Sequence, residues 1–319
     1  MIEIKSLIKQ KYTFREFEAL GTINLIKIFD CFDENLLDTA VGRVNEIENI
    51  MSAFKTDSDI SRLSRSAGVK SERLHKETIE LLSIAKDLSD LSDGSFDITV
   101  RPLVELWGIG KKQNFIPPKH DIKKVRRLIN YRDIELDFEK QTGFLKRAGQ
   151  AADLGGIAKG YAADEVRRIL IQGGVKSAII NLGGNVIAVG SRTDNNPWQV
   201  GIQNPAAATG VYLGTLNVTD KTIVTSGSNE RFFIKDGVRY HHILDPRTGF
   251  QAQSGLLSVT AVCESSTIAD AVTTAVFVLG MEHGLSLLRK FGAEAIFVHE
   301  NMKVFVTEGL LNSFEIKKC

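Results

Sequence analysis

Apolar positions in the first half of the chain recur mainly at helical spacing. Residues 33–52 and 75–91 repeat apolar side chains every three or four positions, which predicts two amphipathic helices. The preceding run GTINLIKIF, residues 21–29, is rich in β-branched side chains and predicts a strand. Shorter elements are expected next, namely helices at 102–107 and 122–129, a proline-containing loop between them at 111–121, and strands at 134–138 and 143–146.

Beyond residue 177 the pattern changes to short runs of β-branched and aromatic residues. These runs predict strands at 177–184, 185–190, 198–202, 210–218, 222–227, 231–234, 257–262, 294–300 and 303–308. Two helices are expected among them, at 267–279 and 283–291. Such a distribution favours an α+β fold, with mixed sheets of many short strands packed with helices, over a regular βαβ series.

Composition excludes some classes of function. The chain has 319 residues and a net charge of +1, so it offers no general attraction for nucleic acid or an anionic membrane. The basic run KHDIKKVRR, residues 119–127, is interpreted as the solvated face of a helix capped by Asp121. Scattered Cys31, Cys263 and Cys319 indicate neither a disulfide framework nor a zinc site.

The amino-terminal residues contain no apolar run long enough for a signal peptide or a membrane span. The sequence as written therefore predicts a cytoplasmic protein. Export would be expected only if a leader had been removed.

A first candidate for chemistry is ADLGGIAKGYAAD, residues 152–164. Gly155 and Gly156 permit a close backbone approach, and the helix that follows offers free N–H groups to an anion. Lys159 adds a positive charge, whereas Asp153 suits a hydroxyl or ring donor, or a capping role. This is not a Walker A loop, because no Ser or Thr follows the lysine. A nucleotide-binding turn and a simple glycine turn with a capping Asp both remain open.

A second candidate is SSTIADAVTTAVFVLG, residues 265–280, a helix that is apolar nearly all round and is expected to be buried. Asp270 and Thr274 share one face of this helix, with Thr273 beside them. Carboxylate and hydroxyl oxygens suit Mg²⁺. Alternatively, Asp270 pairs locally and the threonines bond back to the helix.

Two further segments carry candidate side chains. HHILDPRTGF, residues 241–250, places His241 and His242 before a turn, where either could be a general base or a structural histidine. DGSFDITVRPLVELWGIG, residues 93–110, could line a site for a flat ring through Phe96 and Trp107, or could simply be core.

Taken in order, the motifs resemble the ApbE family of FAD:protein FMN transferases. The matching stretches run from residue 19 to residue 280 and are ALGT at 19–22, MSAFKTDSDISRLS at 51–64, GSFDITVRPLVELWGIG at 94–110, ADLGGIAKGYAAD at 152–164, INLGGN at 180–185, VTSG at 224–227, HILDPRTG at 242–249 and ADAVTTAVFVLG at 269–280. The resemblance implies an ApbE-like, T-fold-like architecture. It also implies a single flavin transferase domain at 19–310, possibly two subdomains with FAD between them, after an extension at 1–18.

The implied activity is Mg²⁺-dependent cleavage of FAD, transfer of its FMN half to a Thr or Ser hydroxyl of a target flavoprotein, and release of AMP. By resemblance, the metal ligands fall on Gly156, Asp270 and Thr274, with Thr273 at a neighbouring position. His242 matches the residue expected to activate the acceptor hydroxyl, so that His242 and Asp270 are the predicted catalytic residues. The predicted FAD contacts are Leu20, Phe54, Ser95, Phe96, Asp97, Asp153, Lys159 and Leu244.

Three positions depart from the family pattern. Leu20 stands where Met is common, and Phe54 where Tyr is common, so the latter lacks a hydroxyl donor. Thr273 replaces an acid found in some members, which leaves Asp270 as the one side-chain carboxylate of the expected metal site. The acceptor motif, an acidic residue followed by Ser-Gly-Ala-Thr, does not occur in the chain, so self-modification is not expected. An FAD pyrophosphatase and a non-catalytic FAD-binding protein remain as alternatives.

Overall fold

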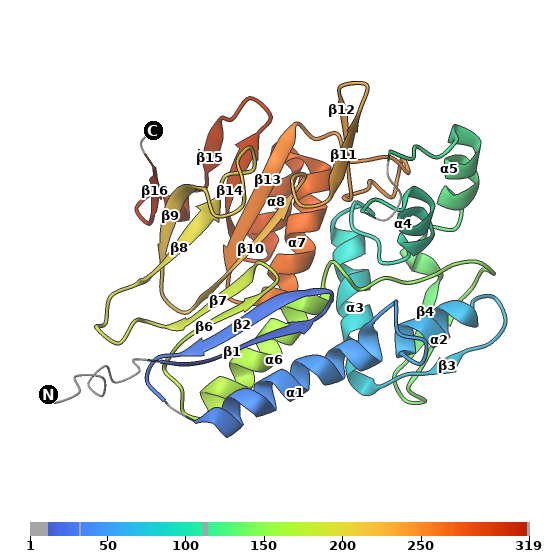
Figure 1. Ribbon diagram of the computed structural model, residues 1–319. Helices are drawn as coiled ribbons and strands as arrows, with labels where there is room; N and C mark the ends of the chain where they lie inside the picture. The colour runs from blue at the N-terminus through green and yellow to red at the C-terminus, as the bar shows by residue number, and fades with distance from the viewer. Residues whose placement is uncertain (1–11, 32, 111–113, 318–319) are drawn as a thin grey trace, which may run out of the picture.

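The architecture is that of a computed structural model, which describes residues 12–31, 33–110 and 114–317. Its centre is an antiparallel sheet in the order β1-β2-β6-β7-β10-β13-β14-β15 (Figure 1). The strands are β1 (Thr13–Ala19), β2 (Thr22–Ile28), β6 (Ser177–Leu182), β7 (Asn185–Gly190), β10 (Lys221–Gly227), β13 (Leu256–Cys263), β14 (Glu294–His299) and β15 (Val304–Val306). Residues 13–18, within the segment expected to be an extension, thus belong to an edge strand of this sheet.

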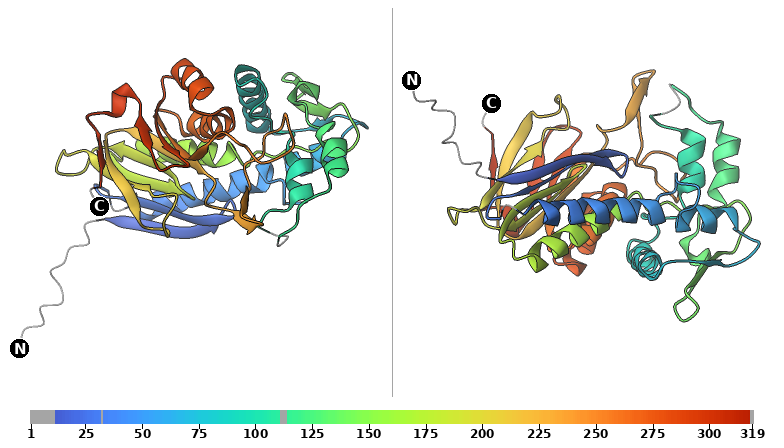
Figure 2. Two further views of the ribbon diagram at one scale, coloured as in Figure 1. Left: turned by 90° about the horizontal axis from the view of Figure 1, so that it is seen from above. Right: turned by 60° about the horizontal axis from the view of Figure 1, so that its bottom comes forward.

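Helices cover one face of the sheet, and Figure 2 shows α1 and α6 running along it. These helices are α1 (Glu34–Met51), α3 (Lys76–Leu91), α6 (Ala158–Gln172), α7 (Ser266–Leu279) and α8 (Met281–Lys290). Their apolar stripes and the facing strand residues form the largest hydrophobic cluster. Arg43 of α1 links the helices by pairing with Glu77 of α3 and Glu165 of α6.

A small second sheet covers part of the other face. It has the order β16-β9-β8 and consists of β8 (Trp198–Gln203), β9 (Tyr212–Val218) and β16 (Phe314–Ile316). Trp198, Leu216 and Phe314 pack there against Ala188 and Val262 of the main sheet. Because β13 is enclosed between these layers, nearly all of its residues are buried rather than alternating, which is typical of a two-sided core strand.

A mainly helical region lies at one end of the sheet (Figure 1). It comprises α2 (Asp59–Arg65), β3 (Glu72–Arg73), α4 (Arg101–Trp107), α5 (Lys119–Arg126), η2 (Tyr131–Asp133), β4 (Ile134–Asp137) and β5 (Thr142–Leu145). The hairpin of β11 (Phe232–Lys235) and β12 (Val238–His241) stands beside α4, and η3 (Glu308–Leu310) follows β15.

The expected α+β class is confirmed. The helix expected at 122–129 is displaced at both ends: α5 runs over Lys119–Arg126, directly after Pro118, and its N-cap is Pro118 rather than Asp121. The reason is that proline is compatible with a helix start, where its missing N–H is not needed. Strands β1, β3, β12 and β16 and helix α2 were not predicted, because most are too short or too polar to show a period.

In the described part of the chain, no helix combines the length and the apolar character needed to cross a bilayer.

Candidate active site

The candidate site is built on the crossing of α6 and α7. At Gly160 of α6, an added Cβ would lie 2.1 Å from the carbonyl oxygen of Ser266, so only glycine allows the two helices to approach this closely. One turn later, Asp164 accepts hydrogen bonds from the backbone N–H groups of Ser266 and Thr267, both at 2.9 Å. Asp164 therefore caps α7 from a neighbouring helix and holds the crossing in place.

Asp270 of α7 lies at this crossing with a nearly buried side chain. Lys159 Nζ donates to Asp270 Oδ1 at 3.2 Å, and the Gly160 N–H donates to Oδ2 at 3.0 Å. A buried carboxylate must be paired or bound to a cation. Here it is paired with the helix that follows the glycine turn, so residues 152–164 and α7 form one cluster.

The two threonines of α7 use their hydroxyl groups differently. Thr273 is fully buried, and its hydroxyl donates to the Ala269 carbonyl at 2.9 Å while accepting from Ser226 Oγ at 3.0 Å. The Thr274 hydroxyl makes longer contacts, 3.3 Å to the Asp270 carbonyl and 3.4 Å to Ser226 Oγ. The expected back-bonding to the helix is thus present, but the Thr274 oxygen is held less tightly than that of Thr273.

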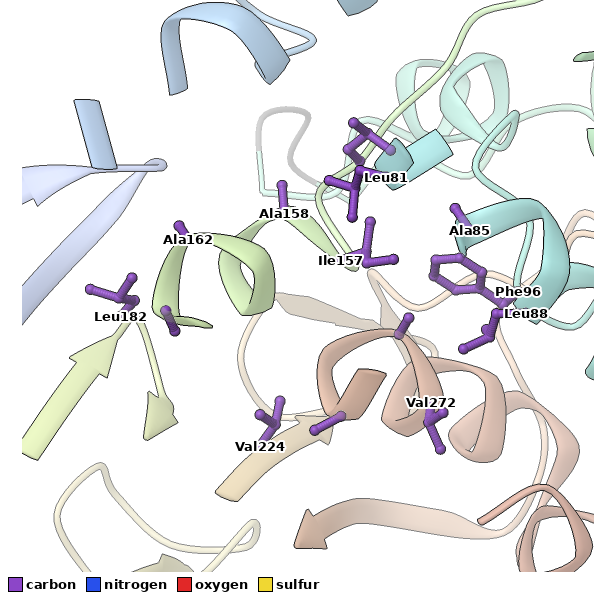
Figure 3. Close-up of a cluster of buried hydrophobic side chains, with 14 of the residues drawn as sticks. Leu81, Ala85, Leu88, Phe96, Ile157, Ala158, Ala162, Leu182, Val224 and Val272 are labelled. Atoms are coloured by element: carbon purple, nitrogen blue, oxygen red, sulfur yellow. The ribbon is translucent and has the colours of Figure 1, made fainter. Parts of the chain in front are cut away.

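The glycine turn approaches Thr274 directly. A Cβ on Gly156 would lie 3.7 Å from Thr274 Oγ1 and 3.2 Å from Phe96 Cε2. Neither Gly155 nor Gly156 has a positive φ, so close approach rather than left-handed backbone explains glycine at these positions. Phe96 is buried among residues of α3, α6 and α7, with its ring beside Ala85 and Leu88 in Figure 3.

Ser95 and Asp97 hold the loop that presents Phe96. Ser95 Oγ donates to the Ala275 carbonyl of α7 at 3.3 Å. Asp97 is buried, and its two carboxylate oxygens accept from the backbone N–H groups of Thr99, at 2.7 Å, and Tyr131, at 3.0 Å. Burial raises the pKa of the Asp97 carboxyl, and the hydrogen bonds from Thr99 and Tyr131 oppose this rise. In this geometry both side chains position a loop.

An open cavity of about 270 Å³ adjoins the glycine turn. Its wall includes Phe54, which is 67% exposed, and Arg101, whose guanidinium lies 4.2 Å from the centre of the Phe54 ring. Arg101 also donates to Asp153 Oδ2 at 3.2 Å, while Asp153 Oδ1 accepts from the Gly155 N–H at 2.8 Å. Asp153 therefore acts as the capping residue of the turn and connects it to Arg101 and Phe54. We call Phe54, Arg101 and Asp153 the rim of the site.

The remaining predicted FAD contacts make their own local interactions. Leu20 lies in the turn between β1 and β2 with a positive φ of 56°, and its N–H donates to Glu48 of α1 at 2.9 Å. This left-handed backbone conformation is energetically unfavourable for a residue with a bulky side chain such as leucine. Leu244 is buried beside α4 and α5, in a cluster with Trp107.

The two histidines differ in their surroundings. His241 Nε2 lies 3.2 Å from the Ala252 carbonyl, and its ring packs edge-on against Phe277. His242 Nδ1 is buried and has no hydrogen-bond partner in the described part of the chain. Burial lowers the pKa of each imidazole to about 4, and the charges of Arg231 and Lys159 add to the effect at His242. His242 is therefore a neutral base with an unused nitrogen, whereas His241 has a structural contact.

Three residues near the site were not assigned a role from the sequence. Ser226 hydrogen-bonds to Thr273, and it lies inside the VTSG stretch, which was the available signal. Asp164 is the last residue of the glycine-turn motif. Because it caps a helix that is distant in the chain, no local sequence pattern indicates this role. Glu230 lies near Lys159 and Asp270, and desolvation by the surrounding protein raises the pKa of its carboxyl.

The donor set contains few acidic or sulfur ligands. Within the described ranges, no three His, Cys, Asp or Glu side chains come together as a metal-binding group. Hydroxyl, carbonyl and carboxylate oxygens are hard donors of the kind that Mg²⁺ prefers.

Comparisons with known proteins agree with the motifs. The sequence profile of the ApbE family matches residues 20–297. An FAD:protein FMN transferase of Klebsiella pneumoniae is 35% identical over 289 residues, covering 90% of this chain and 89% of the relative. That of Treponema pallidum is 34% identical, covering 93% and 87%. The crystal structure of the ApbE protein from Thermotoga maritima superposes with a TM-score of 0.85 at 30% identity, covering 93% of this chain and 97% of that one.

The matched segment includes the glycine turn, the rim and α7, so the contacts described above lie within the shared part of the chain. The match also extends over most of the length of each relative. The chain therefore belongs to the ApbE family.

Proposed function

We propose that this protein is an FAD:protein FMN transferase, which moves the FMN half of FAD onto a Ser or Thr hydroxyl of a target flavoprotein and releases AMP. The observation that carries this proposal is one cluster in which Gly156, Thr274, Asp270 and Lys159 meet beside Phe96. The names of the relatives support the same reaction. The cluster provides oxygen donors for a cation and a positive charge for phosphate oxygens in one place, next to the buried ring of Phe96.

The residues present fit a Mg²⁺ ion. Asp270, Thr274 and the Gly156 carbonyl would hold it, and when bound it would neutralise charge on the diphosphate. Thr273 is less suited, because its oxygen accepts from Ser226 and its hydrogen is used inside the helix. With a single carboxylate the site should bind Mg²⁺ weakly until diphosphate oxygens supply further ligands.

Lys159 provides the chain's own positive charge at the cluster. Its Nζ donates to the Gly155 carbonyl at 3.0 Å as well as to Asp270. The side chain is a quarter exposed and flexible, so it can turn from Asp270 toward a phosphate oxygen. We assign it to orienting the diphosphate.

His242 is the residue we assign to the acceptor hydroxyl. Its neutral imidazole can accept the hydroxyl proton while the hydroxyl oxygen forms a bond to the phosphorus of the FMN half. The bond from that phosphorus to the bridging oxygen breaks, and this oxygen leaves with AMP. The reaction consumes FAD and a protein hydroxyl and yields FMN-protein, AMP and the proton held by His242.

The test is incubation of the full chain with FAD, Mg²⁺ and a soluble carrier protein whose tail contains an acidic residue followed by Ser-Gly-Ala-Thr. Intact mass spectrometry should show the carrier gaining one FMN phosphoryl group, with AMP in equal amount. FMN and AMP without an adduct would identify a pyrophosphatase instead. Bound FAD that stays intact would identify a flavin carrier and overturn the proposal.

A further inference from the structure

Arg101 is a largely buried cation at the rim of the site. Its side chain is 10% exposed, and it occupies the first turn of α4, where the helix dipole opposes a positive charge. Burial of a guanidinium is also unfavourable unless carboxylates pair with it. The stability of α4 alone therefore does not explain an arginine at this position, and the contacts of its side chain indicate another role.

Two carboxylates hold the guanidinium of Arg101. Its Nε donates to Glu105 Oε1 at 2.7 Å, one turn further along α4, and its Nη1 donates to Asp153 Oδ2 at 3.2 Å. The donors of an arginine lie in one plane, so two such bonds define the orientation of the whole group. The protein's own carboxylates thus fix the plane of this guanidinium.

The ring of Phe54 rests on this plane. The Arg101 guanidinium carbon lies 4.2 Å from the centre of the ring, which is a cation–π distance. Phe54 belongs to the connection between α1 and α2 and is 67% exposed. Because a ring this exposed has little packing to orient it, the stacked guanidinium restricts the positions that the ring can take.

The contacts of Arg101 continue into the glycine turn. Asp153, which accepts from Arg101 through Oδ2, accepts from the Gly155 N–H through Oδ1 at 2.8 Å. Arg101 therefore joins three segments that are far apart in the chain, namely the α1–α2 connection, α4 and the turn before α6. Phe54 and Arg101 both lie in the wall of the open cavity. The spacing between a ring bound against Phe54 and a diphosphate bound at the turn then depends on Arg101.

From this geometry we infer that Arg101 is a positioning residue for FAD, which sets the Phe54 ring and the Asp153 carboxylate relative to each other so that both contact the same dinucleotide. The inference rests on the proposed function, because it concerns how the chain holds the FAD of that reaction. Arg101 acts through Phe54 and Asp153 and supplies no group to the chemical step. Its loss should therefore weaken FAD binding and leave the rate of transfer from bound FAD nearly unchanged.

The experiment titrates FAD into the full chain without Mg²⁺, by flavin fluorescence, and then measures transfer to the carrier described above with Mg²⁺ and varied FAD. R101A should raise the Kd and the KM for FAD about tenfold, because Phe54 and Asp153 lose their common partner, while kcat stays within about twofold. R101K should give intermediate values, since lysine keeps a charge near Asp153 but has no planar group to stack on Phe54. Unchanged FAD affinity in R101A, or in R101K, would overturn the inference.

A double-mutant cycle distinguishes positioning from a direct contact with FAD. F54A/R101A should bind FAD no more than about twofold more weakly than R101A, because R101A already lacks the contact of a correctly placed ring. The single changes would multiply if Arg101 bound FAD independently of Phe54. A Kd for the double variant equal to that product would overturn the positioning role.

R167A is the matched control for removal of a partly buried arginine. Arg167 of α6 likewise has two hydrogen-bond partners, the Glu264 carbonyl at 2.9 Å and Asp220 Oδ1 at 2.8 Å. R167A should lower the Tm about as much as R101A does, yet leave the Kd for FAD within about twofold. An equal rise in Kd in both variants would indicate a general loss of stability and would overturn the inference. Normal FAD binding by the unmodified chain without transfer of FMN to the carrier would instead overturn the proposed function.

Discussion

The inner part of the candidate site and its rim are built in opposite ways. At the α6–α7 crossing, Asp270 and Thr273 are buried and hydrogen-bonded to backbone or neighbouring side chains. At the rim, Phe54 is 67% exposed and contacts Arg101 by its face. The difference teaches that the buried groups we propose to lie nearest the diphosphate, Asp270 and Thr273, are held in place by the protein itself, whereas the exposed groups we propose for the rest of FAD can adapt.

The buried groups of the inner part depend on specific neighbouring residues. Asp270 needs both Lys159 and the Gly160 N–H to be stable in a helix that is otherwise apolar. The crossing itself needs a glycine at 160 and the cap from Asp164. Substitutions here should therefore damage catalysis or folding strongly, and substitutions at the rim should mainly change binding.

Asp270→Ala should have the largest effect. We expect kcat for FMN transfer to fall by about 10³-fold, because the one carboxylate of the proposed metal cluster is lost. The fold should persist, since Lys159 is a quarter exposed and can turn to solvent. Transfer is measured by intact mass, and folding by circular dichroism. Asp220→Ala, which removes an exposed partner of Arg167, is the control and should retain full activity. Transfer at the normal rate by Asp270→Ala would falsify the metal assignment.

His242→Gln should reduce kcat by about 10²-fold, a typical contribution of a general base. Because burial and the charges of Arg231, His241 and Lys159 lower the pKa of His242 to about 4, the imidazole is already neutral at pH 6. The rate should therefore show no His242 titration between pH 6 and 8, and should fall only as the pH approaches 4, where protonation removes the acceptor nitrogen. An inflection near pH 6.5 that disappears in His242→Gln would contradict the buried, neutral histidine.

Gly160→Ala tests the helix crossing through stability. The new methyl group would lie 2.1 Å from the Ser266 carbonyl oxygen, so α6 and α7 must separate, at a cost of about 1–3 kcal/mol. Thermal unfolding should show a lower Tm, with weaker transfer because Asp270 loses its position. Gly42→Ala in α1 is the matched control, since nothing lies within 4 Å of its Cβ position. Gly42→Ala should raise the free energy of unfolding by about 1 kcal/mol through helix propensity. Equal changes in Tm for Gly160→Ala and Gly42→Ala would argue against a tight crossing.

The features of the site that depend on local pattern can be predicted from the sequence. The all-apolar helix with an embedded Asp270, the turn at Gly155 and Gly156, and the amphipathic α1 follow from periodicity and residue type. The approach of Gly156 to Thr274 follows only from the family resemblance, and the contact of Gly156 with Phe96 was not predicted, because these residues are far apart in the chain.

Contacts that bridge distant segments could not be read from the pattern. The capping role of Asp164 has no local signal, since its partners Ser266 and Thr267 lie about a hundred residues later in the chain. The stacking of Arg101 on Phe54 is likewise a tertiary contact between residues that each look ordinary in sequence. The edge strand β1 gives a weak apolar signal, because charged Glu16 and Glu18 occupy its exposed side and charged Arg15 lies on its half-buried side.

Phe54→Ala is expected to have the smallest effect and addresses the rim. Loss of the aromatic face should raise the KM for FAD about three- to tenfold and leave kcat nearly unchanged, because an aromatic contact of this kind contributes roughly 0.5–1.5 kcal/mol. Phe54→Tyr keeps the face and should bind FAD as the unmodified chain does. The measurement is steady-state transfer with varied FAD, supported by direct FAD titration. A fall in kcat at constant KM would show that Phe54 belongs functionally with Asp270, and the distinction between a fixed interior and an adaptable rim would then be wrong.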